Sequence, residues 1–260
     1  MHSGPLMRLS LFLCILLTAS ANAQNIAEQY LLQQVNQHRA EQRLAPLAWD
    51  ATLARAARAH ALLIARSPGP AEHQYPGEPD LLTRAAQAGA HFSTISENVA
   101  GNAQSAPQLD TSWMNSPHHR ANILNPQLTA IGIAVVQSRG LLYAVQDFAR
   151  NVANFSPNDA EARAQQLLQT HGLQPETSSQ AHADARHACS QSSQSLNQPV
   201  PSSPQLVVQW EGSDLNQLPA AVLNSAQQAP TKPQAAAVAT CTPTRQNPGF
   251  TTYRLAVLLY

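Results

Sequence analysis

The first part of the chain follows helical hydrophobic spacing in two long stretches. Apolar positions recur at three- and four-residue intervals over residues 25–42 and again over 51–66. Asp50 directly precedes the second stretch and can accept hydrogen bonds from its first backbone amides, as an N-cap does. Two shorter helices are predicted over 81–88 and 107–115.

Two runs of apolar and β-branched residues come after these helices. They cover residues 129–137 and 141–148, and Ser138-Arg139-Gly140 separates them. A short polar break that contains glycine predicts a β-hairpin. Helices followed by a strand pair favour an α+β fold, in which helices cover a sheet. No internal repeat is evident in the sequence.

A boundary is expected near Phe155-Ser-Pro-Asn158. Asn158 or Asp159 can cap a helix that runs to His171, where Gly172 ends it. Most of residues 174–205 is rich in Ser, Gln and Pro, which predicts a linker or a long loop.

Strand patterns return near the end of the chain, at residues 206–210, 235–241 and 250–260. A small β-rich C-terminal region is therefore predicted. The expected segments are 1–23 as a signal peptide, 24–155 as the first domain, 156–205 as a capped helix with linker, and 206–260 as the C-terminal region.

The N-terminus has the layout of a secretory signal peptide. Arg8 supplies the positive charge, residues 9–17 the apolar core, and Ala21-Asn22-Ala23 a small-residue cleavage site. Cys14 lies inside the apolar core without the small residues that precede a lipidated cysteine. We expect a mature chain that starts at Gln24 and is secreted, into the periplasm or the medium. No later segment approaches the roughly 20 apolar residues of a transmembrane helix.

Removing the signal peptide would leave two of the three cysteines, Cys189 and Cys241. In an exported protein the simplest expectation is one disulfide between them. A loop of about 50 residues closed in this way stabilises by roughly 4 kcal/mol in the chain-entropy model. Free thiols or a metal site are the alternatives.

The charge content excludes one class of partner. Charged residues make up 12% of the chain and the formal net charge is zero. Lys232 is the only lysine, and no basic cluster is present. Nucleic acid is therefore not an expected partner.

Candidate chemistry is concentrated in three segments. His73 begins the segment His-Gln-Tyr-Pro-Gly-Glu78, and Glu97 lies in Ser-Glu-Asn. His119 lies in Trp-Met-Asn-Ser-Pro-His-His-Arg, which begins at Trp113. Imidazoles and carboxylates bind metals and transfer protons near neutral pH. Their spacing is much wider than in the helical His-Glu-x-x-His motif of metalloproteases, so sequence distance alone does not unite them.

These segments, in this order, resemble the bacterial branch of the CAP superfamily, which includes cysteine-rich secretory proteins, antigen 5 and pathogenesis-related proteins. Further matches are Leu44-Ala-Pro-Leu-Ala-Trp-Asp50, Ser-Pro-His-His119-Arg and Tyr143-Ala-Val-Gln-Asp-Phe148. The resemblance covers residues 29–150. It implies a three-layer α-β-α sandwich for the first domain.

The resemblance also implies a cleft lined by two histidines and two acidic residues, in which some family members bind zinc or another divalent ion. The matching positions are His73, Glu97 and His119, with Glu78 as the best candidate for the second acid. His73 and His119 would be the metal ligands. Ser96 stands where the family usually has glycine.

The leading hypothesis is a non-catalytic secreted binding module. Its cleft would hold a divalent cation or a small ligand, including a lipid-like one, and its partner would be a small molecule, a lipid or a cell-surface component. One alternative is an extracellular metal-dependent hydrolase or peptidase with Glu97 as the base. Another is a scaffold whose C-terminal strands bind the partner. Whether the protein is an enzyme stays open.

Other polar residues have simpler explanations. His60 is expected to be a packed core residue, and His118 to face solvent. Arg120 is expected to make a structural contact, Trp113 to lie in the core, and Ser116 to belong to a turn rather than to a nucleophile motif.

Overall fold

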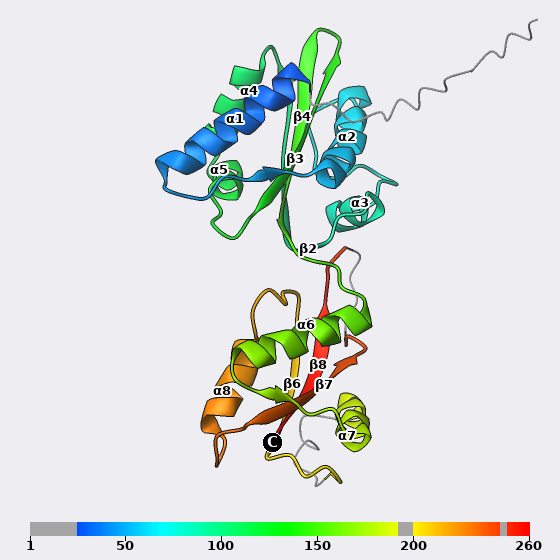
Figure 1. Cartoon of the computed structure of the whole chain (residues 1–260). Helices are drawn as coiled ribbons and strands as arrows, with labels where there is room; N and C mark the ends of the chain where they lie inside the picture. The colour runs from blue at the N-terminus through cyan, green and yellow to red at the C-terminus, as the bar shows by residue number, and fades with distance from the viewer. Residues whose placement is uncertain (1–24, 192–199, 245–248) are drawn as a thin grey trace, which may run out of the picture.

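A computed structural model describes residues 25–191, 200–244 and 249–260. These residues form two units, each built on a four-stranded sheet with helices against it (Figure 1). The expected signal peptide and its cleavage site lie outside the described residues.

The first helices begin where the capping residues predict. Helix α1 (Ile26–Glu41) starts with a capping box, in which Asn25 and Glu28 each bind the other's backbone amide. Helix α2 (Ala51–Arg66) follows β1 (Ala48–Trp49), and Asp50 accepts hydrogen bonds from its first turn. Helix α3 (Leu81–Gln87) ends before Gly89, whose φ of +87° suits a helix end.

The predicted hairpin forms the middle of the first sheet. Strands β3 (Ala130–Ser138) and β4 (Leu141–Asn151) are antiparallel, and both residues of the turn between them have positive φ, 51° at Arg139 and 78° at Gly140. That combination belongs to the tight turns that match strand twist. The strand order is β1-β3-β4-β2.

The strand β2 (Phe92–Ala103) was not predicted. It pairs with β4 along most of its length and forms an edge of the sheet. Its core-facing positions carry polar residues such as Glu97 and Asn98, so the alternation of apolar and polar residues that signals a strand is absent. These polar residues belong to the candidate site described below.

Helices cover both faces of this sheet, which gives the three layers implied by the resemblance (Figure 1). Helix α2 packs on one face, while α1, α4 (Ala106–Asn115) and α5 (Pro117–Ile123) lie on the other. The predicted helix end at Ser116 is correct. A further helix begins there, because Pro117 occupies a first-turn position where its missing amide hydrogen is not needed.

The second unit contains more helix than predicted. Its elements are α6 (Pro157–Thr170), β5 (Gln174–Pro175), α7 (Ser179–Ser190), β6 (Leu206–Gly212), α8 (Ala220–Gln228), β7 (Ala235–Cys241) and β8 (Tyr253–Leu259). The α+β class and a sheet-rich, disulfide-linked C-terminal region are confirmed.

Two details of the prediction are wrong. Helix α6 is capped by Ser156, not by Asn158 or Asp159, because Pro157 already occupies its first turn. Part of the segment 174–205, which was expected to be a linker or long loop, is also regular structure: β5 covers 174–175 and α7 covers 179–190. Helix α7 lies there, and its buried Ala181, Ala185 and Ala188 pack on the second sheet.

The two units share one topology although their sequences show no repeat. The second sheet has the order β5-β7-β8-β6, and its parallel and antiparallel pairings match those of β1-β3-β4-β2. Helix α6 corresponds to α1, α7 to α2, and α8 to the pair α4 and α5, since each packs on the equivalent strand. The second unit therefore repeats the sandwich in a shorter form.

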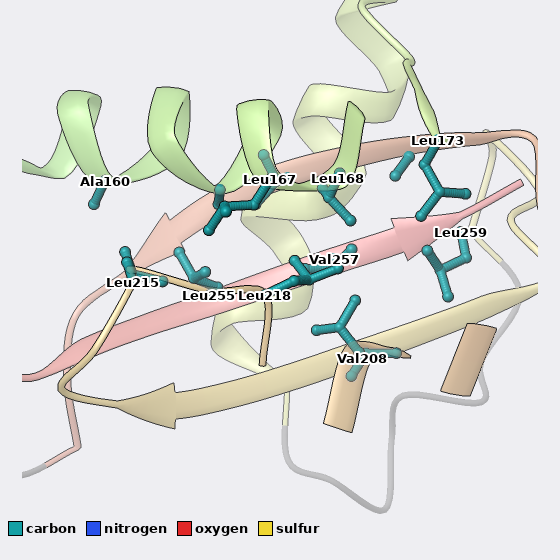
Figure 2. Packing of buried hydrophobic residues seen from close by; sticks show 14 of the residues in the cluster. Ala160, Leu167, Leu168, Leu173, Val208, Leu215, Leu218, Leu255, Val257 and Leu259 are labelled. Carbon is teal, nitrogen blue, oxygen red and sulfur yellow. The ribbon is translucent and has the colours of Figure 1, made fainter. Parts of the chain in front are cut away.

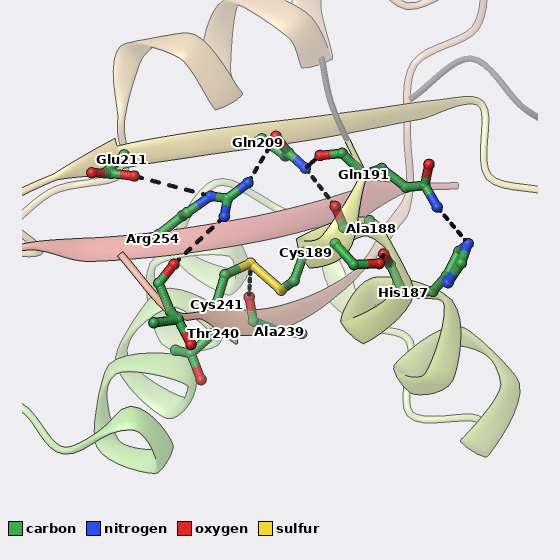
Figure 3. Close-up of a disulfide and its surroundings, with 12 residues drawn as sticks. His187, Ala188, Cys189, Gln191, Gln209, Glu211, Ala239, Thr240, Cys241 and Arg254 are labelled. Carbon is green, nitrogen blue, oxygen red and sulfur yellow. Dashed lines mark hydrogen bonds and ion pairs between the residues drawn. A yellow bond between two sulfur atoms is a disulfide. The ribbon is translucent and has the colours of Figure 1, made fainter. Parts of the chain in front are cut away.

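The core of the second unit is apolar. Figure 2 shows leucines and valines of α6 and the sheet interlocking, among them Leu168, Val208 and Leu255. On the opposite face, the predicted disulfide between Cys189 and Cys241 joins α7 to β7, with 5.2 Å between the two Cα atoms (Figure 3). The disulfide prediction is confirmed.

Candidate functional site

The candidate site is built on the edge strand β2 and its neighbour β4. Glu97 of β2 lies opposite Asp147 of β4, which in turn lies opposite Gly132 of β3. Residues opposite one another in a sheet point to the same face. This face is covered by α2, so both carboxyl groups are directed into the protein beneath that helix.

The buried side chain of Glu97 contacts one exposed residue, His73, and one buried residue, Arg84. Its Oε1 lies 2.8 Å from Nδ1 of His73, whose side chain is 60% exposed, whereas the side chain of Glu97 is only 2% exposed. Its Oε2 accepts a 2.5 Å hydrogen bond from the buried guanidinium of Arg84. A buried carboxylate thus holds an exposed imidazole in one orientation.

A second buried pair supports this arrangement. Nδ1 of His60 lies 2.7 Å from Oε1 of Glu78, and both side chains are almost fully buried. The other ring nitrogen of His60 lies 2.9 Å from the carbonyl oxygen of Glu72. Arg84 stands between the two acids, 3.7 Å from Glu78. The single guanidinium therefore partly neutralises two carboxylates.

Asp147 is the third carboxyl group of the cluster. It is fully buried, and neither of its oxygens has a hydrogen-bond partner in the described part of the chain. Burial, followed by the negative charge of Glu97, raises the pKa of Asp147 well above its ordinary value. The environment of Asp147 thus favours its protonated form.

The pKa values of the exposed His73 and the partly buried His119 shift in opposite directions. The hydrogen bond to Glu97 raises the pKa of His73. Burial and the charges of His73 and His118 lower the pKa of His119. These shifts favour the charged form of His73 and the neutral form of His119.

The backbone on the far side of β2 is fixed by amide side chains. Asn98 donates to the carbonyl oxygen of His119, at 3.1 Å, and accepts from Asn122, at 2.9 Å. Asn122 also donates to the carbonyl oxygen of Glu97. These bonds tie α5 to β2, so the position of His119 relative to Glu97 does not depend on the histidine itself.

The structure brings His73 and Glu97 into direct contact and sets His119 within electrostatic range. Glu78 lies behind them with His60, away from solvent. His60 is buried as expected, although it is ion-paired rather than simply packed. His118 is exposed, Trp113 is fully buried, and Arg120 donates to the carbonyl oxygen of Met114.

Sequence reasoning missed Arg84 and Asp147. Arg84 stands on a short helix whose pattern predicts only an amphipathic surface element. Asp147 follows Gln146 in the middle of β4, between apolar residues on both sides, and that break in the apolar run was the available signal. A lone carboxylate at a core-facing strand position is costly unless it is paired or protonated, so it indicates a specific environment.

The donor set suits a divalent cation only in part. Among the described residues, no three His, Cys, Asp or Glu side chains form a group arranged to hold a metal ion. His73 and His119 could supply two nitrogens, with Glu97 behind His73 as a carboxylate that orients the ring. The remaining positions would fall to water or to an external ligand.

Comparison with known proteins identifies the first unit. The model of the cysteine-rich secretory protein (CAP) family matches residues 32–148. The uncharacterised protein YkwD of Bacillus subtilis is 31% identical over 121 residues, which cover 46% of this chain and 47% of YkwD. The chain thus spans about half the length of this curated relative. The first unit is a CAP domain and belongs to the bacterial members of that superfamily.

Solved structures of the same kind also resemble the chain. An extracellular protein with an SCP domain from Bacillus anthracis is 28% identical, with a TM-score of 0.44 and coverage of 47% of this chain and 40% of that one. An outer surface protein of Borrelia burgdorferi is 20% identical, with a TM-score of 0.45 and coverage of 48% and 92%. These matches concern only about half of the chain.

A search for membrane-crossing helices covered the residues that the structure describes. None of those helices combines the length and the apolar character that crossing a bilayer requires.

Proposed function

We propose that this protein is a secreted binding module whose CAP-domain cleft holds a divalent cation or a small ligand at His73 and His119. The observation that carries the proposal is the contact between His73 Nδ1 and buried Glu97. In the neutral ring, Nδ1 donates to Glu97 and Nε2 has a free lone pair. Because the pKa of His73 is raised, a cation would bind there with release of a proton. A carboxylate behind a histidine is the usual support of a metal-binding imidazole.

His119 would supply the second nitrogen. Its lowered pKa keeps the ring neutral near pH 7, the form that binds metal. Asn98 and Asn122 hold its backbone in place without using its side chain. A cation such as Zn²⁺, with two protein ligands, would keep open positions for a ligand from outside.

The test is a calorimetric Zn²⁺ titration of the chain from Gln24 onward. Wild type is expected to bind one ion, and His73→Ala/His119→Ala to bind at least about tenfold more weakly. His118→Ala is the matched control, since this neighbouring histidine is exposed and is not part of the proposed cleft. Equal binding by wild type and the double variant would overturn the cation site.

The alternative is a metal-dependent hydrolase with Glu97 as the base. Both oxygens of Glu97 are already engaged, one by His73 and the other by Arg84, so Glu97 would have to leave one partner to accept a proton. Turnover that is lost in Glu97→Gln while zinc binding and the thermal transition persist would favour the hydrolase. Absence of turnover in wild type would favour the binding module.

Secretion rests on the N-terminal sequence and is tested separately. Export of the full chain with removal of residues 1–23 is expected, and the N-terminal residue of the exported protein, measured by mass spectrometry, should derive from Gln24. Retention of an uncleaved chain inside the cell would contradict this part of the proposal.

A further inference from the structure

The second unit has an open cavity of about 420 Å³, and none of its lining residues belongs to the proposed CAP-domain cleft. It lies between the end of α6, the end of α8 and the loop that leads to β7. Its lining consists of His171, Leu173, Leu218, Leu223, Ala226, Gln227, Ala229, Lys232 and Pro233. A volume of this size is within the range of small-molecule sites.

In the first unit, an arginine side chain occupies the topologically corresponding region. There the fully buried Arg39 extends from the end of α1 and donates to carbonyl oxygens of the loop before β1 and of the segment after α5. These elements correspond in topology to α6, the loop before β5 and the end of α8. The second unit has no such arginine at the end of α6, and the space remains open.

The floor of the cavity is apolar. Leu173 and Leu218 are 5% and 4% exposed and belong to the core of the second unit (Figure 2). Leu223 and Ala226 of α8 form one wall and are only partly buried. An apolar floor that water can reach favours an occupant with a hydrocarbon body.

Among the described residues, Lys232 is the only Lys, Arg, Asp or Glu in the lining of the cavity. Lys232, the only lysine of the chain, is exposed at the rim, and His171 lies on the same rim. No Asp or Glu of the described part of the chain lines the cavity, although the whole chain has as many Asp and Glu as Lys and Arg. A carboxylate head group is complementary to this rim, whereas a cationic head group is not.

We propose that this cavity binds a medium-chain alkyl carboxylate as a monomer. The alkyl chain of the ligand would lie against Leu173, Leu218 and Leu223, and its carboxylate would lie beside Lys232. This site is separate from the cleft of the CAP domain, and the proposal does not depend on what that cleft binds.

The test is a titration of the chain from Gln24 onward with decanoate, below its micelle concentration, followed by calorimetry. Ala226→Trp places an indole in the cavity and is expected to weaken binding more than tenfold. Gln228→Trp, on an exposed position of α8 outside the lining, is the matched control and should bind as wild type does. A thermal transition equal to that of wild type shows that the variants are folded.

Two further arms test the head group and the location. Lys232→Gln should weaken decanoate binding about threefold, as expected for an exposed ion pair, and leave decanol binding unchanged. His73→Ala/His119→Ala should bind decanoate normally. Equal binding of decyltrimethylammonium, unchanged binding by Ala226→Trp, or binding only to anionic phospholipid vesicles and not to monomeric decanoate would each overturn the proposal.

Discussion

The two units arrange their strands and helices in the same way, yet they bury different chemistry. At three matched positions of the sheets the first unit has Glu97, Asp147 and Gly132. In the same register the second has Val207, Leu258 and Ala237. Charged groups and a glycine in one unit are replaced by apolar side chains in the other.

The difference separates stability from function. The second unit is held by a continuous apolar core and by a disulfide, a cross-link that stabilises a small domain. The first unit keeps three carboxyl groups and an arginine under α2, although hydrophobic residues of similar size would be as stable or more so. Such a cluster therefore indicates a role beyond packing, and it stands directly behind His73.

The largest effect is expected from removing the one cation that the buried acids share. Arg84→Met leaves Glu97 and Glu78 without their guanidinium, which should lower the free energy of unfolding of the first unit by about 3–5 kcal/mol. Urea unfolding followed by hydrogen exchange in each unit measures this. Arg66→Met, at the exposed end of α2, is the control and should change stability by less than about 0.5 kcal/mol.

The second unit should respond instead to loss of its disulfide. Cys189→Ser/Cys241→Ser opens a loop with a sequence separation of 52, and the chain-entropy model gives a loss of about 4 kcal/mol. Hydrogen exchange should increase in α7 and β7 and stay unchanged in α2 and β4. An equal increase in both units would show that they unfold together and would contradict their separate stabilisation.

A smaller effect is expected at the matched glycine. A Cβ on Gly132 would lie 2.1 Å from the backbone nitrogen of Ala54, so α2 must move to accept it. Gly132→Ala should cost about 1–3 kcal/mol and shift the thermal transition downward. Ala237→Gly in the second unit should cost about 1 kcal/mol or less, because the helix there already accommodates a methyl group.

The smallest effect concerns pH. Because the pKa of Asp147 is raised, the unfolded chain loses this proton at lower pH than the folded protein does. Stability contributed by this group is present in acid and declines as pH rises above about 4. Asp147→Asn should remove that decline, so the difference in unfolding free energy between wild type and variant should change as the pH rises above about 4. A difference that does not change with pH would show that Asp147 is ionised in the folded state.

Much of the fold could be predicted from local signals. Caps such as Asp50 and helical spacing gave the bounds of α1 and α2, and the Arg139-Gly140 turn gave the hairpin of β3 and β4. The sequence motifs predicted the CAP domain, and two cysteines in an exported chain predicted the disulfide. These signals succeed because each depends on neighbours in the sequence or on a short list of possible partners.

The sequence by itself determined the class of the first unit and, through the family resemblance, named His73, Glu97 and His119 as candidates for one site. Only the tertiary structure decided that Arg84 and Asp147 join them, that the second unit repeats the first, and that a cavity opens where Arg39 lies in the first unit. The reason is physical. Ion pairs, burial and empty volume arise between elements that pack together after each has formed, and hydrophobic periodicity records only which face of an element is buried.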